Sequence, residues 1–135
     1  MEYVNFVFGM TEVEINGVAH DLHNFYDFKK IQYDLGNKVV VLTWHKKFGA
    51  PKEEPNRVDI EFKDVCHFST VERGPKMPFS EDSCLLSMLF VAEQDKTESA
   101  FYDDFPSSDL HCIFQFHSGF KIRVFAAEVR CNIGT

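Results

Sequence analysis

The sequence predicts a mainly β protein, an antiparallel sandwich or partly open barrel of about eight or nine strands with at most one short helix. The first observation is a period-two alternation of apolar and polar residues, which is typical of half-buried strands. The second is the presence of fifteen phenylalanines, whose rings fill the core between two sheets packed about 10 Å apart. With 135 residues and no linker-like segment, the chain is expected to form a single domain over residues 1–135.

In the first half of the chain, alternation and turn residues predict five successive strands. These strands cover residues 4–8, 12–15, 18–22, 28–34 and 39–44. Asn16-Gly17 predicts a tight hairpin, because both positions of such a turn must accept positive φ. Gly36-Asn37 predicts a second turn. The strand over 39–44 is apolar on both faces and is therefore expected at the centre of a sheet.

In the second half, a loop with two prolines over residues 48–57 precedes further strands. Alternation predicts these strands over residues 58–65, 110–116, 120–124 and 129–133. The apolar phase slips at Lys63-Asp64 and again at Ala126-Ala127, so a bulge or bend is expected at each place. Residues 84–92 are a continuous apolar run that suits a buried strand or a short helix, and the strand is favoured. Residues 93–109 form the longest excursion between strands.

The charge balance argues against several classes of partner. Fourteen basic and twenty-one acidic residues give a net charge of -7, and no basic stripe is visible, so neither nucleic acid nor an anionic membrane surface is expected as a partner. No apolar run approaches the roughly 18–20 residues of a membrane helix. The N-terminal segment lacks the basic start of a signal peptide. A cytoplasmic location is therefore expected.

The four cysteines do not have the spacing of a zinc knuckle. They are Cys66, Cys84, Cys112 and Cys131. Each has apolar neighbours, and free cysteine packs like a small hydrophobic residue. Reduced, buried thiols are expected, while the sequence alone leaves a disulfide open.

The segment His20-Asp21-Leu22-His23 is a weak candidate for a metal site. Two imidazoles and one carboxylate are close in sequence, but residues three apart on a strand face opposite ways, so a turn with polar caps is favoured over a site formed by His20, Asp21 and His23. His67 and His111 each adjoin a cysteine, yet adjacent strand residues also face opposite ways. A cysteine–histidine pair assembled between strands stays open. His111 and His117 are both expected to face outward. No cofactor is predicted.

Paired acids lie in two of the predicted loops. These are Glu53-Glu54 and Asp103-Asp104. Acidic residues in loops are usually solvated, but such pairs can also contact and steer a basic partner protein. We therefore take these four residues as the candidate partner-binding set.

Three stretches resemble the small bacterial β-rich immunity proteins of polymorphic toxin systems. They are His20-Asp21-Leu22 through Trp44, the strand over residues 58–65, and the turn and strand over 118–126. Together they cover about half of the chain and consist of β patterns and turns. The resemblance implies a cytoplasmic protein that acts by binding and without catalysis, and it assigns no functional residue.

The sequence therefore predicts a non-enzymatic binding protein, of an immunity or accessory type, whose ionisable side chains are dispersed over a β scaffold. One alternative is a β-barrel or sandwich that binds a small molecule, suggested by the abundance of aromatic residues. A further alternative is a cryptic metal-dependent hydrolase that uses His20, Asp21 and His23. Dimerisation through a strand edge or an apolar face is left open.

Overall fold

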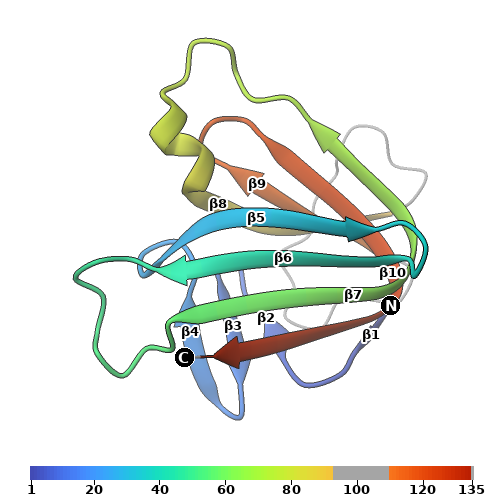
Figure 1. Cartoon of the computed structure of the whole chain (residues 1–135), viewed down its shortest axis with the longest axis horizontal. Helices are drawn as coiled ribbons and strands as arrows, with labels where there is room; N and C mark the ends of the chain where they lie inside the picture. Colours follow the sequence, from blue (N-terminus) through green and yellow to red (C-terminus); the bar gives the residue numbers. More distant parts are fainter. Residues whose placement is uncertain (93–109, 135) are drawn as a thin grey trace.

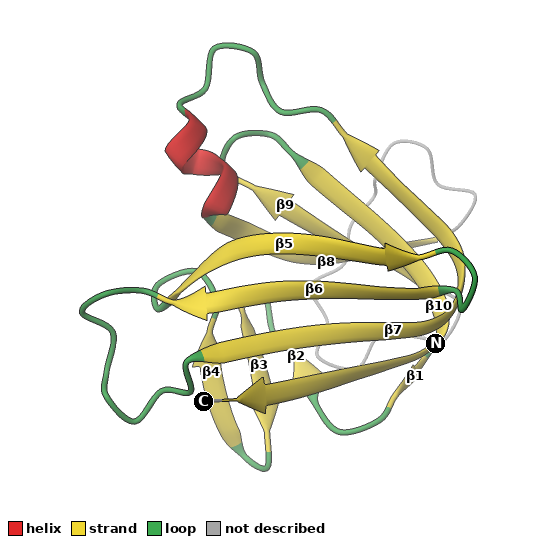
Figure 2. Cartoon of the chain, in the orientation of Figure 1, coloured by secondary structure: helices red, strands yellow, loops and turns green. Residues whose placement is uncertain are grey.

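The computed structural model describes residues 1–92 and 110–134, and strands dominate these residues (Figures 1 and 2). In chain order the elements are β1 (Glu2–Tyr3), β2 (Val7–Phe8), β3 (Glu12–Ile15), β4 (Val18–Asp21), β5 (Tyr26–Asp34), β6 (Val39–Lys46), β7 (Arg57–Val71), the 3-10 helix η1 (Phe79–Ser83), β8 (Leu85–Ala92), β9 (Leu110–Phe116) and β10 (Lys121–Gly134). The predicted fold class is confirmed. Within the described residues, no helix has the length and apolar character needed to cross a membrane.

Two sheets face each other across the core. The large sheet has the antiparallel order β5-β6-β7-β10-β9-β8, and β1 adds to β10 in parallel. It curls around the small antiparallel sheet β2-β3-β4, which lies behind it in Figure 1. Aromatic rings fill the space between them, and Phe8 of the small sheet contacts Phe90 and Phe114 of the large sheet at centroid distances of 5.6 and 6.0 Å.

The predicted turns and bends are found where the alternation places them. Asn16 and Gly17 both have positive φ, 54° and 80°, and connect β3 to β4. The two predicted phase slips are one bend seen in two paired strands, because Val65 and Lys63 of β7 pair with Ala126 and Glu128 of β10. Residues 84–92 form a strand over Leu85–Ala92, and the short helix precedes it.

The four cysteines are free, as predicted, but their burial differs. Cys112 and Cys131 are buried, Cys84 is half-buried and Cys66 is exposed. The expectation of a buried Cys66 is wrong because the register between β7 and β10 shifts there. His67 pairs with Phe125 and Val65 with Ala126, so Cys66 is the extra residue of a bulge and its side chain leaves the core.

Candidate functional site

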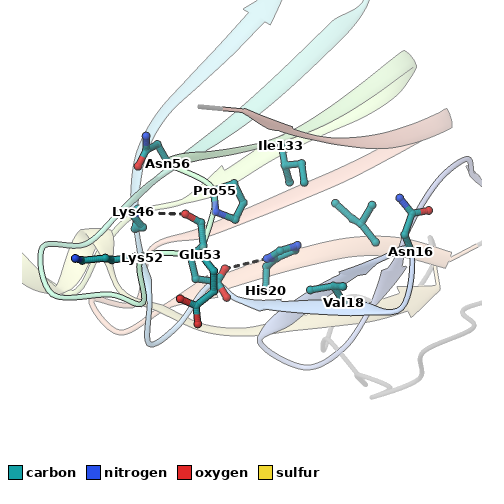
Figure 3. Close-up of a pocket in the computed structure, with 11 residues that line it drawn as sticks. Asn16, Val18, His20, Lys46, Lys52, Glu53, Pro55, Asn56 and Ile133 are labelled. Atoms are coloured by element: carbon teal, nitrogen blue, oxygen red, sulfur yellow. Dashed lines mark hydrogen bonds and ion pairs between the residues drawn. The ribbon is translucent and has the colours of Figure 1, made fainter.

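A groove of about 560 Å³ lies between the β3–β4 hairpin, the loop that joins β6 to β7, and the end of β10 (Figure 3). Two sheets meet here without pairing to each other, since β4 is the last strand of the small sheet. The lining combines apolar, amide and charged side chains: Ile15, Asn16, Val18, His20, Lys46, Lys52, Glu53, Glu54, Pro55, Asn56 and Ile133.

Inside the groove, a buried hydrogen-bonded set ties the loop to both sheets. His20 Nδ1 lies 2.9 Å from Glu54 Oε2, and the two side chains are only 7% and 11% exposed. The Tyr26 hydroxyl lies 3.0 Å from the same carboxylate oxygen and 2.8 Å from Pro55 O. Burial, followed by the Glu54 carboxylate, raises the pKa of Tyr26, so the phenol remains a donor. Lys46 Nζ also donates to Glu54 O at 3.1 Å.

The rim of the groove is open to solvent. Val18 and Ile133 are 55% and 46% exposed although both are large and apolar. Lys52 and Glu53 are exposed on the loop side of the groove, where Figure 3 shows the Lys52 side chain pointing away from His20. The polar groups inside the groove are therefore hydrogen-bonded to one another, whereas its rim consists of solvent-exposed apolar and charged side chains.

The end of β10 presents a strand edge to this groove. Alternate residues of β10 direct their backbone groups away from β7. Val129 O accepts from Val4 N at 3.0 Å, and the Asn5 side chain bonds Cys131 N and O at 2.9 and 2.8 Å. The Asn5 side-chain amide thus makes the two hydrogen bonds to Cys131 that a residue of a neighbouring strand would make. The next residue in this alternation is Ile133, which lies past the end of β1 and lines the groove.

The structure separates the three residues of the candidate metal site. His20 bonds Glu54, while the Asp21 carboxylate accepts from the backbone amides of His23 and Asn24 at 2.9 and 3.0 Å. This is the turn with polar caps that the sequence favoured. Among the described residues, neither His20 nor Asp21 belongs to a group of three metal-binding side chains.

The predicted partner-binding acids have different environments. Glu53 lies on the rim of the groove, whereas Glu54 is turned inward and holds the loop. Asp103 and Asp104 lie outside the described residues. Of the acids that the sequence singled out and the structure describes, Glu53 alone is exposed for contact with a partner.

The expectation that the ionisable side chains are dispersed over the β scaffold is wrong beside the start of β8. His23, Cys84 and His117 each offer a ligand atom within 4.8 Å of the others. No local spacing could reveal them, because His23 and Cys84 are 61 residues apart in sequence and His117 is on a third segment.

His111 lies on the face of β9 opposite the core residues Cys112 and Phe114, as alternation predicts, but it is buried there and does not reach solvent. Its ring stacks on Phe125 at 4.7 Å, and its Nδ1 accepts from Arg123 Nε at 2.9 Å. Burial and the Arg123 charge lower the pKa of His111 to about 4, so the ring is neutral near pH 7. The outer face of β9 is covered too, where Ile113 packs with Leu89 and Val91.

Comparison of the chain with family models, curated proteins and solved structures finds no match. The resemblance to immunity proteins therefore stays a prediction, and function has to be argued from the sites themselves.

Proposed function

We propose that the protein is a non-enzymatic binding protein that takes an extended segment of a partner protein into the groove beside β10. The observation that carries this proposal is the strand edge at Ile133, which opens onto a groove with an exposed apolar rim. An extended peptide gains affinity by pairing its backbone with such an edge and gains specificity by seating alternate side chains in pockets.

The rim favours a segment that alternates apolar and charged side chains, because Lys52 and Glu53 are both exposed there. Val18 and Ile133 offer apolar contact, and Glu53 offers a free carboxylate. The net charge of -7 steers a basic partner toward the whole molecule. An immunity-type or accessory role in the cytoplasm fits these features, and the four free thiols suit a reducing compartment.

The interior of the groove supports binding over catalysis. His20 and Glu54 are bonded to each other, and Tyr26 shares the carboxylate, so these groups stabilise the fold and are not free to act on a substrate. The lining residues include no serine, threonine or cysteine that could act as a nucleophile.

Affinity capture from native-cell lysate, followed by binding with the purified partner, tests this function. Ile133→Pro removes the backbone donor that would pair with the segment but leaves the β7 side of the strand intact, whereas Ile133→Val retains the donor. We expect a stoichiometric partner that binds wild type and Ile133→Val and loses at least about tenfold in affinity, or about 1.4 kcal/mol, with Ile133→Pro. Recovery of chaperones alone, or equal affinity for all three chains, would contradict the proposal.

A matched pair of surface variants controls for non-specific stickiness. Val18 on the groove and Val71 at the far end of β7 are 55% and 51% exposed. We expect Val18→Lys to weaken the partner complex and Val71→Lys to leave it unchanged. Equal losses would place the contact elsewhere.

Binding of a small molecule in the groove is the second candidate function, because the groove volume of about 560 Å³ is within the roughly 300–1,000 Å³ of known ligand pockets. A small molecule does not need the backbone edge. Binding of a metabolite that Val18→Lys abolishes and Ile133→Pro leaves unchanged would therefore favour this function over peptide binding.

A further inference from the structure

Three side chains that are able to bind a metal and are far apart in sequence come together where η1 leads into β8. Cys84 Sγ lies 3.6 Å from His23 Nδ1, and the rings of His23 and His117 have centroids 5.5 Å apart. All three side chains are half-buried, so an ion can reach them from solvent and is still partly enclosed.

Backbone hydrogen bonds hold the three segments in register. His117 N donates to Cys84 O at 2.9 Å, which fixes the end of β9 beside the residue that precedes β8. Lys47 Nζ donates to His23 O at 3.2 Å and thereby holds the turn that carries His23. The approach of the three side chains is therefore built into the fold and does not depend on one flexible loop.

One ring nitrogen in the cluster has no hydrogen-bond partner among the described residues. This atom is His117 Nε2, which is buried. Buried polar atoms in folded proteins almost always have a partner, and an absent ion is one of the usual reasons for an exception. This is the observation, independent of the clustering, that points to a ligand.

The protonation of His23 also suits a metal ligand. Its Nδ1 lies 2.7 Å from Leu85 O, a carbonyl that only accepts, so Nδ1 carries the proton and Nε2 keeps the free lone pair. Metal-bound histidines commonly donate their second ring N–H to a backbone carbonyl in this way.

The same hydrogen bond argues against a cysteine nucleophile activated by His23. A base must accept the thiol proton, but the nearer nitrogen already holds a proton for Leu85 O. Burial raises the pKa of the Cys84 thiol, and the nearby Lys47 charge opposes this only in part. Without an ion, Cys84 is therefore a neutral thiol.

We propose that His23, Cys84 and His117 form a binding site for a single transition-metal ion of the zinc type. One thiolate and two imidazoles suit zinc and its neighbours, whereas magnesium and calcium require oxygen ligands. Bond lengths of about 2.0–2.3 Å place tetrahedral ligand atoms about 3.3–3.6 Å apart, so ligand atoms within 4.8 Å of one another reach this spacing by side-chain rotation. His23 also has to present Nε2 to the ion, because Nδ1 is the nitrogen that now lies 3.6 Å from Cys84 Sγ. The fourth position is left for water or an external ligand.

Titration of the purified full chain with Co²⁺ and Zn²⁺ tests the site. We expect one equivalent of Co²⁺ to give a near-ultraviolet thiolate charge-transfer band, which Zn²⁺ then abolishes by displacement. We expect Zn²⁺ binding to weaken by at least about 100-fold in each of the variants Cys84→Ser, His117→Gln and His23→Gly, which is more than the loss of a residue that only hydrogen-bonds a ligand usually causes. Cys66→Ser and His45→Gln alter an exposed thiol and an exposed imidazole outside the cluster and are expected to bind as wild type.

A measurement on the unmodified chain keeps the test independent of how well the variants fold. We expect one equivalent of Zn²⁺ to slow alkylation of Cys84 at least about tenfold and to leave alkylation of the exposed Cys66 unchanged. Absence of one-to-one binding, a Co²⁺ spectrum without the thiolate band, or equal protection of both thiols would overturn the proposal. Partner binding in the separate β10 groove does not enter either measurement.

Discussion

Two turns of this protein have nearly the same sequence and different surroundings. Asp21-Leu22-His23-Asn24 begins at the last residue of β4, and Asp34-Leu35-Gly36-Asn37 begins at the last residue of β5. In both, the aspartate carboxylate accepts from the backbone amide and side-chain amide of the asparagine three residues later, at 2.7 to 3.1 Å. The local chemistry of the turn is thus the same.

The difference lies in what each turn meets. Leu22 is fully buried, whereas Leu35 is 75% exposed. His23 meets Cys84 and His117, while its counterpart Gly36 makes the same turn with no side chain. The turn therefore does not require an imidazole at this position. The comparison indicates that His23 is explained by its tertiary neighbours.

The largest expected difference between the turns concerns their leucines. Leu22→Ala removes a fully buried side chain, and we expect the free energy of unfolding to fall by about 2–5 kcal/mol. Leu35→Ala acts on an exposed side chain, and we expect a change within about 0.5 kcal/mol. Urea denaturation measures both. Similar losses for the two variants would show that the turns are equally embedded.

The residue before each turn differs in a comparable way. His20 precedes the first turn and bonds Glu54 inside the groove, whereas Tyr33 precedes the second and is 40% exposed. Glu54→Ala leaves the buried His20 ring without its carboxylate partner and removes one of the two acceptors near the Tyr26 hydroxyl, which still has Pro55 O, so we expect a loss of about 1–3 kcal/mol in urea denaturation. Glu53→Ala is the control, with an expected change within about 0.5 kcal/mol. A Glu54 variant as stable as the Glu53 variant would mean that this pair does not hold the loop.

These contrasts show how far the sequence alone could lead. The strands, the Asn16-Gly17 hairpin and the bend opposite Ala126-Ala127 were predictable because alternation and turn chemistry are local. The exposure of Cys66 could not be predicted from the sequence, because it depends on the register of β7 against β10. The approach of His23 to Cys84 was not predictable either, since it requires the packing of distant segments.

If the proposed metal site is correct, the two turns differ in how their variants change the stabilisation of the protein by Zn²⁺. At free Zn²⁺ about 100 times its dissociation constant, the wild-type chain gains about 2.7 kcal/mol in stability. His23→Gly gives the first turn the sequence of the second and is expected to abolish this gain. Gly36→His places an imidazole on the second turn, which contributes no residue to the group of metal-binding side chains found among the described residues, and should add nothing. Zinc stabilisation of His23→Gly equal to that of wild type would remove His23 from the site.

The smallest expected effects concern the aspartates, and they distinguish turn stability from metal binding. Asp21→Ala and Asp34→Ala each remove the same set of cap hydrogen bonds, so each is expected to lower the free energy of unfolding by about 1 kcal/mol. Only Asp21 also accepts from the amide of a proposed ligand, at 2.9 Å from His23 N. We therefore expect Asp21→Ala to weaken Zn²⁺ binding by about tenfold and Asp34→Ala to leave it unchanged. Asp21→Asn keeps an acceptor oxygen and should restore most of the affinity. Equal Zn²⁺ affinity for both alanine variants would show that the turn does not position His23, although the turn would still contribute to stability.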